Sequence, residues 1–270
     1  MRSLALALLL SVAGAAPAAD FEVTVVKDIK YRTDEDADKV RNALDVYVPK
    51  GAKDFPVLFL VHGGTWQYGS KDTFRQVGEG FAKLGIGVVC PNYRLSPKVK
   101  HPAHIEDVAK AFAWTVDTVA KHGGDPKKIV LAGHSAGGHL VSLLGTDETY
   151  LKAEQKSFAD VKGVIGVSGV YEIYPVLFAK VFGSDAKAAS PLTHVNKSCP
   201  PCLLIYGDKD LPTLDNMAKN MCKALVGAKC DAEVCEIKGR NHGTVMSSAK
   251  KPDDPVFEKM ESAIRKWTTK

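Results

Sequence analysis

Apolar residues recur along this chain in two different patterns. Over residues 21–29 and 44–48 they alternate with polar residues, which predicts two strands of an antiparallel pair, half exposed at the edge of a sheet. Further along, the apolar residues form short continuous runs, as is typical of parallel strands covered on both faces. These runs occupy residues 57–61, 87–90, 129–132, 163–167 and 203–206. The pattern predicts a mostly parallel central sheet with an antiparallel N-terminal edge.

Helical periodicity fills the intervals between the apolar runs. Segment 104–121 has apolar residues on one helical face and is followed by Gly123, a residue type that commonly ends helices. Similar patterns predict helices over about residues 214–226 and 254–267, with a last strand over about 233–237. Because strands and helices alternate, we expect βαβ units and an α/β fold with helices on both faces of the sheet.

Composition narrows the class of protein. The chain has 270 residues, of which 45% are hydrophobic and 25% charged, enough apolar material for one large core. No Pro/Gly/Ser-rich linker divides it, so we expect a single domain. The formal net charge is +5, from 36 basic and 31 acidic residues, and the basic residues are scattered along the chain. We therefore expect no nucleic-acid partner.

The first eighteen residues have the organisation of a secretory signal peptide. Arg2 precedes an apolar run over residues 4–13, and Ala16-Pro17-Ala18 matches the A-x-A cleavage pattern. The apolar run is shorter than the roughly 20 residues that a membrane-spanning helix needs, so we expect cleavage and no stable membrane anchor. The mature protein would be one domain over residues 19–270, secreted or periplasmic.

An exported protein can form disulfides, and five of the six cysteines lie in the last third of this chain. Cys199 and Cys230 each closely precede a predicted strand, and neighbouring parallel strands would bring them together, whereas Cys222 could reach Cys230 instead. The connectivity stays open. Cys199 and Cys202 have C-x-x-C spacing, but no second such pair completes a zinc site, so we expect neither a metal nor a cofactor. The full set is Cys90, Cys199, Cys202, Cys222, Cys230 and Cys235.

A G-x-S-x-G motif lies between a predicted strand and a predicted helix. It reads Gly133-His134-Ser135-Ala136-Gly137, and its position predicts a tight turn that strains the backbone of Ser135 and holds its hydroxyl clear of the sheet. The two outer glycines lack the side chains that would collide in such a turn. Ser135 is the candidate nucleophile, although such a motif also arises by chance with its serine as an ordinary helix cap.

A second motif follows the strand predicted over residues 57–61. It reads His62-Gly63-Gly64-Thr65-Trp66, and glycines here would let backbone N–H groups approach a reacting carbonyl oxygen. We expect an oxyanion hole from the N–H groups of Gly64, Thr65 and Ala136, with possible help from Gly63. The alternative interpretation of the glycine pair is a plain turn.

The base and its orienting acid should follow the serine on later loops, because ligands collect at the carboxyl ends of parallel strands. His242 is the only histidine after the candidate acids and is therefore the expected general base. Asp210 is preferred over Asp208 as the acid because it lies deeper in its loop, while Asp208 is expected to bond to its own turn.

At these residues the chain resembles the α/β-hydrolase superfamily, and within it the small carboxylesterases related to the hormone-sensitive lipase group. The resemblance covers nearly all of the mature chain and rests on LDVYVP, HGGTW, GSKD, NYRLSP, GHSAGG, YGDKD and NHG, in the family order. It implies hydrolysis of carboxylic esters through an acyl-enzyme intermediate, without a cofactor or metal. Thr65 departs from the usual HGGG. HGGxW is instead the pattern of kynurenine formamidases and of some exported esterases that remove acetyl or feruloyl groups from plant polysaccharides.

Three functions follow from this resemblance. The first is a secreted carboxylesterase for short acyl or aryl esters, with the esters of acetylated or feruloylated carbohydrates as candidate substrates. The second is an arylformamidase. The signal peptide argues against this function, because the substrate of an arylformamidase is normally intracellular. The third is a hydrolase fold used as a non-catalytic binding module, against which the complete serine, acid and histidine set argues.

Aromatic residues supply candidate substrate contacts. Segment 171–178, which includes Phe178, is aromatic-rich and lies just beyond a strand end, although it could equally be a short core helix. Trp66 and Tyr93 could line the leaving-group side or serve packing alone. Only about thirty residues separate the flanking strands, as counted along the chain. We therefore expect a minimal cap, an open and shallow pocket, and a preference for small acyl groups over long-chain lipids.

Overall fold

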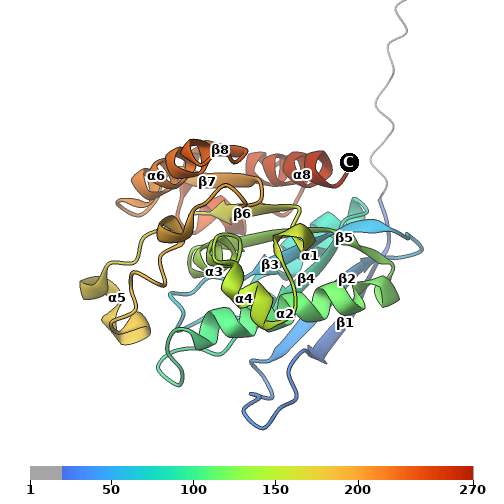
Figure 1. Cartoon of the computed structure of the whole chain (residues 1–270). Coiled ribbons are helices and arrows are strands. Elements are labelled where there is room, and N and C mark those ends of the chain that lie inside the picture. The colour runs from blue at the N-terminus through green and yellow to red at the C-terminus, as the bar shows by residue number, and fades with distance from the viewer. Residues whose placement is uncertain (1–19, 270) are drawn as a thin grey trace, which may run out of the picture.

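One eight-stranded sheet organises the part of the chain that the computed structural model describes, residues 20–269. The expected signal peptide, residues 1–18, lies outside the described residues. The strand order is β1-β2-β4-β3-β5-β6-β7-β8 (Figure 1). β1 and β2 run antiparallel to each other, β2 runs antiparallel to β4, and the remaining neighbours are parallel. The prediction of a mostly parallel sheet with an antiparallel N-terminal edge is confirmed.

Each predicted strand is present, but β5 begins five residues earlier than predicted and β8 ends four residues later. The strands are β1 (Val23–Lys30), β2 (Ala43–Pro49), β3 (Phe55–Val61), β4 (Gly87–Pro91), β5 (Gly124–His134), β6 (Gly163–Val167), β7 (Cys202–Lys209) and β8 (Ala232–Asn241).

The expectation of two half-exposed edge strands is correct for β1 and wrong for β2. β2 lies between β1 and β4 and is buried along almost its whole length. Its polar residue Asp45, 1% exposed, faces no solvent, because the Lys71 ammonium lies 2.9 Å from its carboxylate. Tyr47 likewise packs into the core. The polar position in the alternating pattern of β2 therefore marks a buried ion pair and not a side of the strand that faces solvent.

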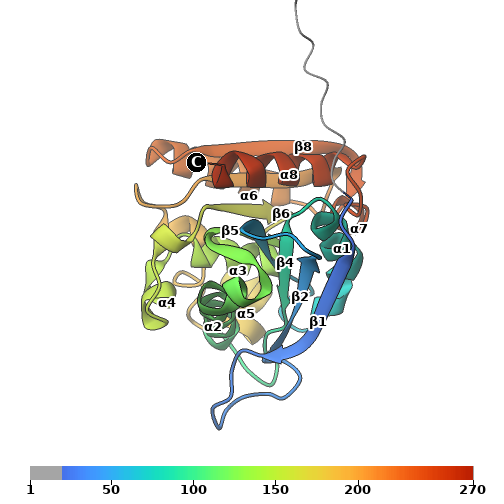
Figure 2. The same cartoon turned by 90° about the vertical axis from the view of Figure 1, so that its right-hand side faces the viewer.

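Helices cover both faces of the sheet, as expected. They are α1 (Arg75–Lys83), α2 (Ala103–Thr118), α3 (Ala136–Leu144), α4 (Glu148–Ala153), α5 (Pro175–Phe182), α6 (Leu214–Gly227), α7 (Thr244–Ser247) and α8 (Pro255–Thr268). One core cluster contains side chains of α2, α3 and α6, and the other contains side chains of α1, α7 and α8. Figure 2 shows α2 and α3 on one side of the sheet and α1 and α7 on the other.

The helix predicted over residues 104–121 is two helices in succession. α2 ends at Thr118, and a 3-10 helix, η2 (Val119–His122), continues the turn. Gly123 then takes a left-handed conformation with φ 90°, the role expected of it. Three further 3-10 helices are η1 (Lys71–Phe74), η3 (Phe158–Asp160) and η4 (Pro191–His194).

The connection between β6 and β7 projects from the body of the fold. It contains α5 and η4, and α5 projects at the left of Figure 1. Val176 and Leu177 on α5 are 93% and 71% exposed. The region is thus a small cap with a helix at its outer end, not a large lid.

All six cysteines are free thiols, so the expected local disulfide is not present in the structure. Cys199 and Cys230 do lie near each other, as their shared contacts with Asn196 show. The N–H of Asn196 donates to the Cys199 sulfur at 3.3 Å, and the Cys230 thiol donates to the Asn196 carbonyl at 3.2 Å. Each sulfur therefore has a backbone partner in place of a covalent one.

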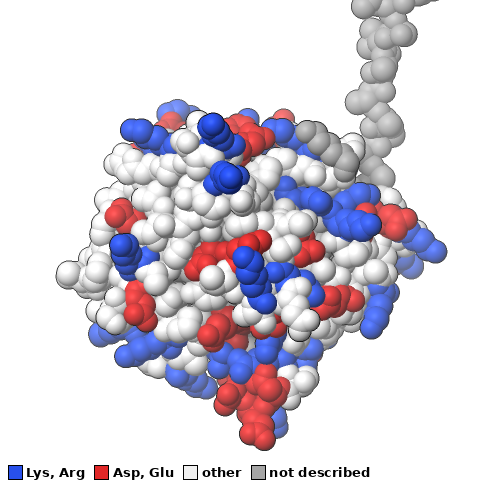
Figure 3. Space-filling model, in the orientation of Figure 1, with Lys and Arg blue, Asp and Glu red and all other residues white. Residues whose placement is uncertain are grey.

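Two surface properties concern possible partners. Lys and Arg are interspersed with Asp and Glu over the face drawn in Figure 3. Among residues 20–269, none of the helices combines the length and apolar character needed to cross a bilayer.

Candidate active site

Ser135 occupies a strained turn between β5 and α3. Its backbone angles are φ 55° and ψ −119°, in a region that costs a residue with a side chain about 1–3 kcal/mol. The turn is tight because the chain packs against itself and against β3. A Cβ at Gly133 would lie 2.3 Å from the Gly137 carbonyl oxygen, and one at Gly137 would lie 2.1 Å from the Val61 carbonyl oxygen. Both glycines are therefore required for the reason expected from the motif.

The loops after β7 and β8 bring an acid and a histidine to this serine. His242 Nδ1 donates to Asp210 Oδ1 at 2.7 Å. With its proton on Nδ1, the ring presents a bare Nε2 that accepts the Ser135 hydroxyl at 2.9 Å. The three side chains expected to act together thus form one hydrogen-bonded chain, in the arrangement that lets an imidazole remove a proton from a serine.

Asp210 is held as a carboxylate by several donors. Its Oδ2 accepts hydrogen bonds from the Ser168 hydroxyl and, at 3.2 Å, from the Gly207 N–H, while its Oδ1 also accepts the Leu211 N–H at 2.8 Å. Burial alone would raise the pKa of Asp210. The hydrogen bonds from His242 and Ser168, followed by those from the backbone, outweigh burial and lower the pKa to about 2.

Sequence reasoning missed Ser168. It directly follows β6 at the carboxyl edge of the sheet, is 2% exposed and has φ 48°. The signal that could have found it is its place, since a polar residue just after a buried parallel strand lies on the same edge as the other functional groups.

Asp208 lies outside the hydrogen-bonded chain. Its side chain is exposed, and it accepts the backbone N–H of Arg240, on β8, at 3.2 Å. The expectation that it bonds to its own turn is wrong, because a register irregularity between β7 and β8 brings the neighbouring strand within reach.

His242 is supported from two sides. The His134 ring donates through Nε2 to the His242 carbonyl at 2.7 Å. Burial lowers the pKa of His134 to about 4, so this ring stays neutral near pH 7. On the other side, the Asn241 side chain accepts the N–H groups of Gly243 and Thr244 at 3.1 and 2.9 Å. These contacts fix the backbone that carries the imidazole.

The glycine loop, residues 62–69 after β3, lies against the nucleophile. A Cβ at Gly63 would stand 3.1 Å from the Ser135 Cβ. Gly64 and Thr65 have φ 116° and 50°. Within residues 20–269, the N–H groups of Gly64, Thr65 and Ala136 donate to no protein acceptor, which leaves these donors available beside the serine.

Two of the three candidate substrate contacts are buried. Trp66 is 1% and Tyr93 0% exposed, and both belong to the core, so of the two roles left open for them the structure supports packing and not lining of the leaving-group side. Tyr93 stacks on His62 and donates its hydroxyl to the His62 carbonyl at 3.2 Å. Phe178, on α5, is half-buried, and its ring centroid lies 5.2 Å from that of Trp66.

A protein-family model matches about two thirds of the chain. The BD-FAE model matches residues 44–225. The chain belongs to the BD-FAE family. Among curated relatives of this BD-FAE chain, Probable carboxylic ester hydrolase LipM of Mycobacterium tuberculosis is 33% identical over 177 residues, which are 57% of this chain and 41% of LipM. Esterase LipC of the same organism is 31% identical over 231 residues, 74% of this chain and 56% of LipC. The BD-FAE chain spans about half the length of these relatives.

Solved structures share the fold of the BD-FAE chain. A truncated carbohydrate esterase from gut microbiota aligns with TM-score 0.79 at 23% identity, covering 95% of this chain and all of that one. Esterase Est2 of the Planctomycetes species Thermogutta terrifontis aligns with TM-score 0.74 at 24% identity, covering 93% and 92%. The predicted α/β-hydrolase fold is confirmed.

The described residues offer no obvious place for a metal ion. Within residues 20–269, no three or more His, Cys, Asp or Glu side chains group in a way that could hold one.

Proposed function

We propose that this protein is a serine carboxylic ester hydrolase with Ser135 as nucleophile. The observation that carries the proposal is the hydrogen-bonded chain from Asp210 through His242 to Ser135, next to backbone N–H groups that have no protein acceptor. The relatives LipM and LipC are named as a probable carboxylic ester hydrolase and an esterase, which supports the same reaction class.

The proposed reaction has two balanced halves. Ser135 Oγ attacks the ester carbonyl carbon while His242 Nε2 takes the hydroxyl proton, and the N–H groups of Gly64, Thr65 and Ala136 stabilise the oxyanion. The C–O bond to the alcohol then breaks, and the alcohol leaves with the proton from His242. Water attacks the acyl-serine by the same route and releases the carboxylic acid and free Ser135.

Asp210 contributes orientation and charge to this reaction. Its carboxylate keeps the His242 proton on Nδ1 and stabilises the imidazolium that forms when Nε2 accepts the serine proton. Because its pKa is lowered to about 2, Asp210 stays ionised throughout the pH range in which esterases work.

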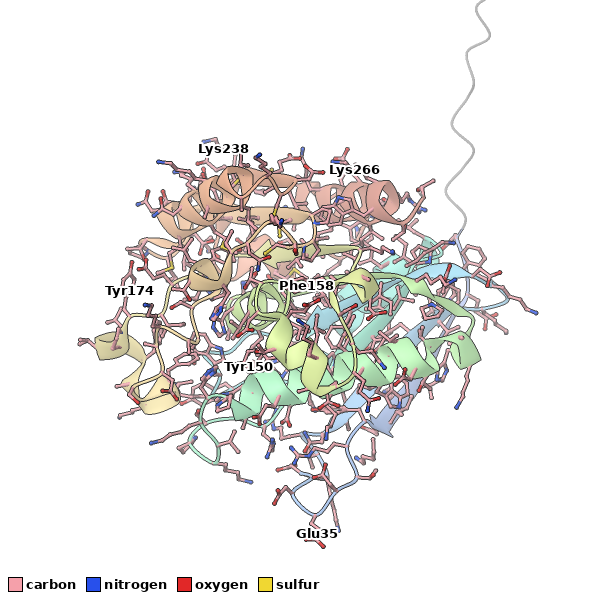
Figure 4. The ribbon with its side chains drawn as sticks, viewed as in Figure 1. Glu35, Tyr150, Phe158, Tyr174, Lys238 and Lys266 are labelled. Atoms are coloured by element: carbon pink, nitrogen blue, oxygen red, sulfur yellow. The ribbon has the colours of Figure 1, made fainter. Side chains whose placement is uncertain are left out.

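A cavity lined by both charged and apolar residues supports an ester with a polar alcohol, such as an acylated carbohydrate. The cavity, about 680 Å³, lies between the β1–β2 loop and the segment after β4, with Gln67 in its wall. Both sides are tied to the glycine loop: Arg41 donates to the Gly69 carbonyl at 2.7 Å, and the Ser96 N–H donates to the Trp66 carbonyl at 2.9 Å. Figure 4 places Glu35 at the tip of the β1–β2 loop. The charged residues lining the cavity have both signs, which suits an uncharged polyhydroxylated group; they are Glu35, Asp36, Asp38, Arg41, Arg94 and Lys98.

The proposal further includes short acyl groups and export. The small cap formed by α5 offers little surface for a long chain, in keeping with a preference for acetyl or other short groups. The leader pattern over residues 1–18 supports a secreted or periplasmic enzyme, where polysaccharide esters would be accessible.

The test compares the purified protein with Ser135→Ala. Initial rates are measured on p-nitrophenyl acetate, butyrate and decanoate, on acetylated xylan, on methyl ferulate and on N-formylkynurenine. We expect hydrolysis of the acetyl and butyryl esters, slow hydrolysis of the decanoate, and a loss of roughly 10⁴-fold or more in kcat in the variant. Strong preference for N-formylkynurenine would replace the esterase by an arylformamidase. No turnover of any substrate would favour a non-catalytic binding module.

A further inference from the structure

Trp66 makes a buried hydrogen bond that the proposed reaction does not use. Its indole Nε1–H donates to His139 Nδ1 at 3.1 Å, and both side chains are essentially inaccessible to solvent. The His139 Nε2 lies 2.7 Å from the Ala189 carbonyl oxygen. Since a carbonyl only accepts, Nε2 carries the proton, and Nδ1 is left as the acceptor that the indole requires.

The two partners belong to the two parts of the proposed oxyanion hole. Trp66 directly follows Thr65 in the glycine loop. His139 lies one helical turn after Ser135 in α3, and its backbone N–H donates to the Ser135 carbonyl at 2.9 Å. Gly64 and Thr65 supply N–H donors from the first part, and Ala136 supplies one from the second.

The glycine loop needs an anchor because its backbone is strained. Thr65 and Trp66 are consecutive residues with side chains, and both have left-handed φ angles, 50° and 59°. Such conformations persist only where the surroundings over-determine them. The rings of His139, Phe178 and Phe182 meet the Trp66 ring edge-on at centroid distances of 5.1, 5.2 and 4.9 Å.

The hydrogen bond is present over the working pH range. Burial lowers the pKa of His139 to about 3, so the ring stays neutral and its Nδ1 remains an acceptor. Protonation would put a proton on Nδ1 facing the indole N–H and break the contact.

We propose that the Trp66–His139 hydrogen bond is a clamp that holds the two parts of the oxyanion hole in register, which makes Trp66 and His139 positioning residues. This inference rests on the esterase function proposed above. Oxyanion donors act only within about 2.7–3.1 Å of the developing charge, and a misplacement of about 1 Å can cost about 100-fold in rate. Loosening the clamp therefore weakens transition-state binding more than substrate binding.

The first test is Trp66→Phe, which keeps an aromatic ring in the cage and removes the N–H. We expect kcat on p-nitrophenyl acetate to fall roughly 10- to 100-fold, with KM changed less than about threefold. The inhibition constant of a trifluoromethyl ketone, which forms an oxyanion with the serine, should rise by the same factor as kcat falls.

The matched control is Trp114→Phe. Trp114 lies on α2 beside His122, with ring centroids 6.1 Å apart, so it repeats the tryptophan–histidine pairing away from the serine. Trp114 is half-buried, and its ring partner His122 belongs to neither α3 nor the glycine loop. We therefore expect kcat, KM and the ketone inhibition constant of this variant to stay within about twofold of the wild-type values.

A double-mutant cycle separates the clamp from general packing. His139→Gln offers an amide that can accept from the indole and donate to Ala189, and it should recover a large part of the kcat that His139→Phe loses. Trp66→Phe combined with His139→Phe should cost little more in kcat than the more damaging single change.

Two outcomes would overturn the clamp. One is Trp66→Phe with wild-type kcat and wild-type ketone inhibition. The other is a double variant whose kcat loss equals the product of the single losses, because independent effects mean that the hydrogen bond couples nothing. Near-ultraviolet circular dichroism establishes that each variant is folded before its kinetics are compared.

The clamp and the proposed function fail in different ways. If wild-type protein hydrolyses short esters while Trp66→Phe is unimpaired, only the clamp is wrong. If the wild-type protein turns over no ester and a fluorophosphonate does not label Ser135, the proposed function is wrong and the clamp falls with it.

Discussion

At the scale of single residues, the site is defined by which groups form hydrogen bonds with one another. Asp210 receives its hydrogen bonds from His242, from the Ser168 hydroxyl and from two backbone N–H groups. Among residues 20–269, the Asp208 side chain, two residues earlier, accepts a hydrogen bond only from the Arg240 backbone N–H. The two carboxylates differ in environment although they share a loop, and this difference can be tested directly.

Asp210→Asn should lower kcat on p-nitrophenyl acetate by about 10⁴-fold. The asparagine amide would face the Nδ1–H of His242 or force the other tautomer, in which Nε2 carries a proton and no longer accepts from Ser135. Asp208→Asn is the matched control, with kcat expected within about threefold of wild type. The reverse ranking of the two variants would show that Asp208 is the acid.

Local sequence patterns identified most of these residues but not their supports. Ser135, His242 and Asp210 stand in recognisable motifs after predicted strands. Ser168 has no motif, and its contact with Asp210 spans 42 positions of the chain. No periodicity encodes such a contact, because it depends on how β6 and β7 lie side by side.

At the scale of elements, the turn between β5 and α3 is limited by close backbone packing. α3 begins directly against β3, so that even one added carbon at Gly137 meets the Val61 carbonyl oxygen. The helix cannot move away without displacing the donors of Ala136 from Ser135. Strand, turn and helix therefore act as one rigid unit.

Two glycine substitutions in helices should have opposite effects on stability. Gly137→Ala places a Cβ 2.1 Å from backbone and should lower the free energy of unfolding by about 3 kcal/mol or more. Gly227→Ala, at the end of α6, meets nothing within 4 Å and should raise it by about 0.5–1 kcal/mol. Urea unfolding followed by circular dichroism measures both. Equal effects would mean that the packing at Gly137 is looser than described.

At the scale of the whole molecule, several histidines are sealed inside the fold. His62, His104 and His139 are 0% exposed. Burial lowers their pKa values to about 4, 4 and 3. In the unfolded chain each would titrate near 6.5. Below that pH the unfolded state therefore binds more protons than the folded one.

Stability should consequently rise with pH between about 4 and 6.5. Each buried histidine lowers the free energy of unfolding by up to about 1.4 kcal/mol per pH unit as the pH falls through this window. Urea midpoints at pH 7.5, 6.5, 5.5 and 4.5 should fall slightly between the first two and more steeply below pH 6.5. His104→Gln removes one of the three groups and should make the decline shallower. A midpoint independent of pH down to 4.5 would contradict the burial of these rings.

The sequence by itself determined the class of fold, the order of the strands along the chain and the candidate nucleophile and base. Continuous apolar runs mark strands covered on both faces, helical periodicity marks the crossovers between them, and parallel strands present their carboxyl ends at one edge. These rules depend only on the local sequence pattern and on the order of the elements along the chain. They place Ser135 and His242 at the same edge without showing their distance.

Only the tertiary structure decided what each side chain touches. It buried Asp45 of β2 against Lys71, buried Trp66 and Tyr93 in the core, and joined Trp66 to His139 across 73 positions of the chain. The physical reason is that burial and hydrogen bonding depend on neighbours brought together by packing, whereas periodicity reports only the conformation of the segment that carries it.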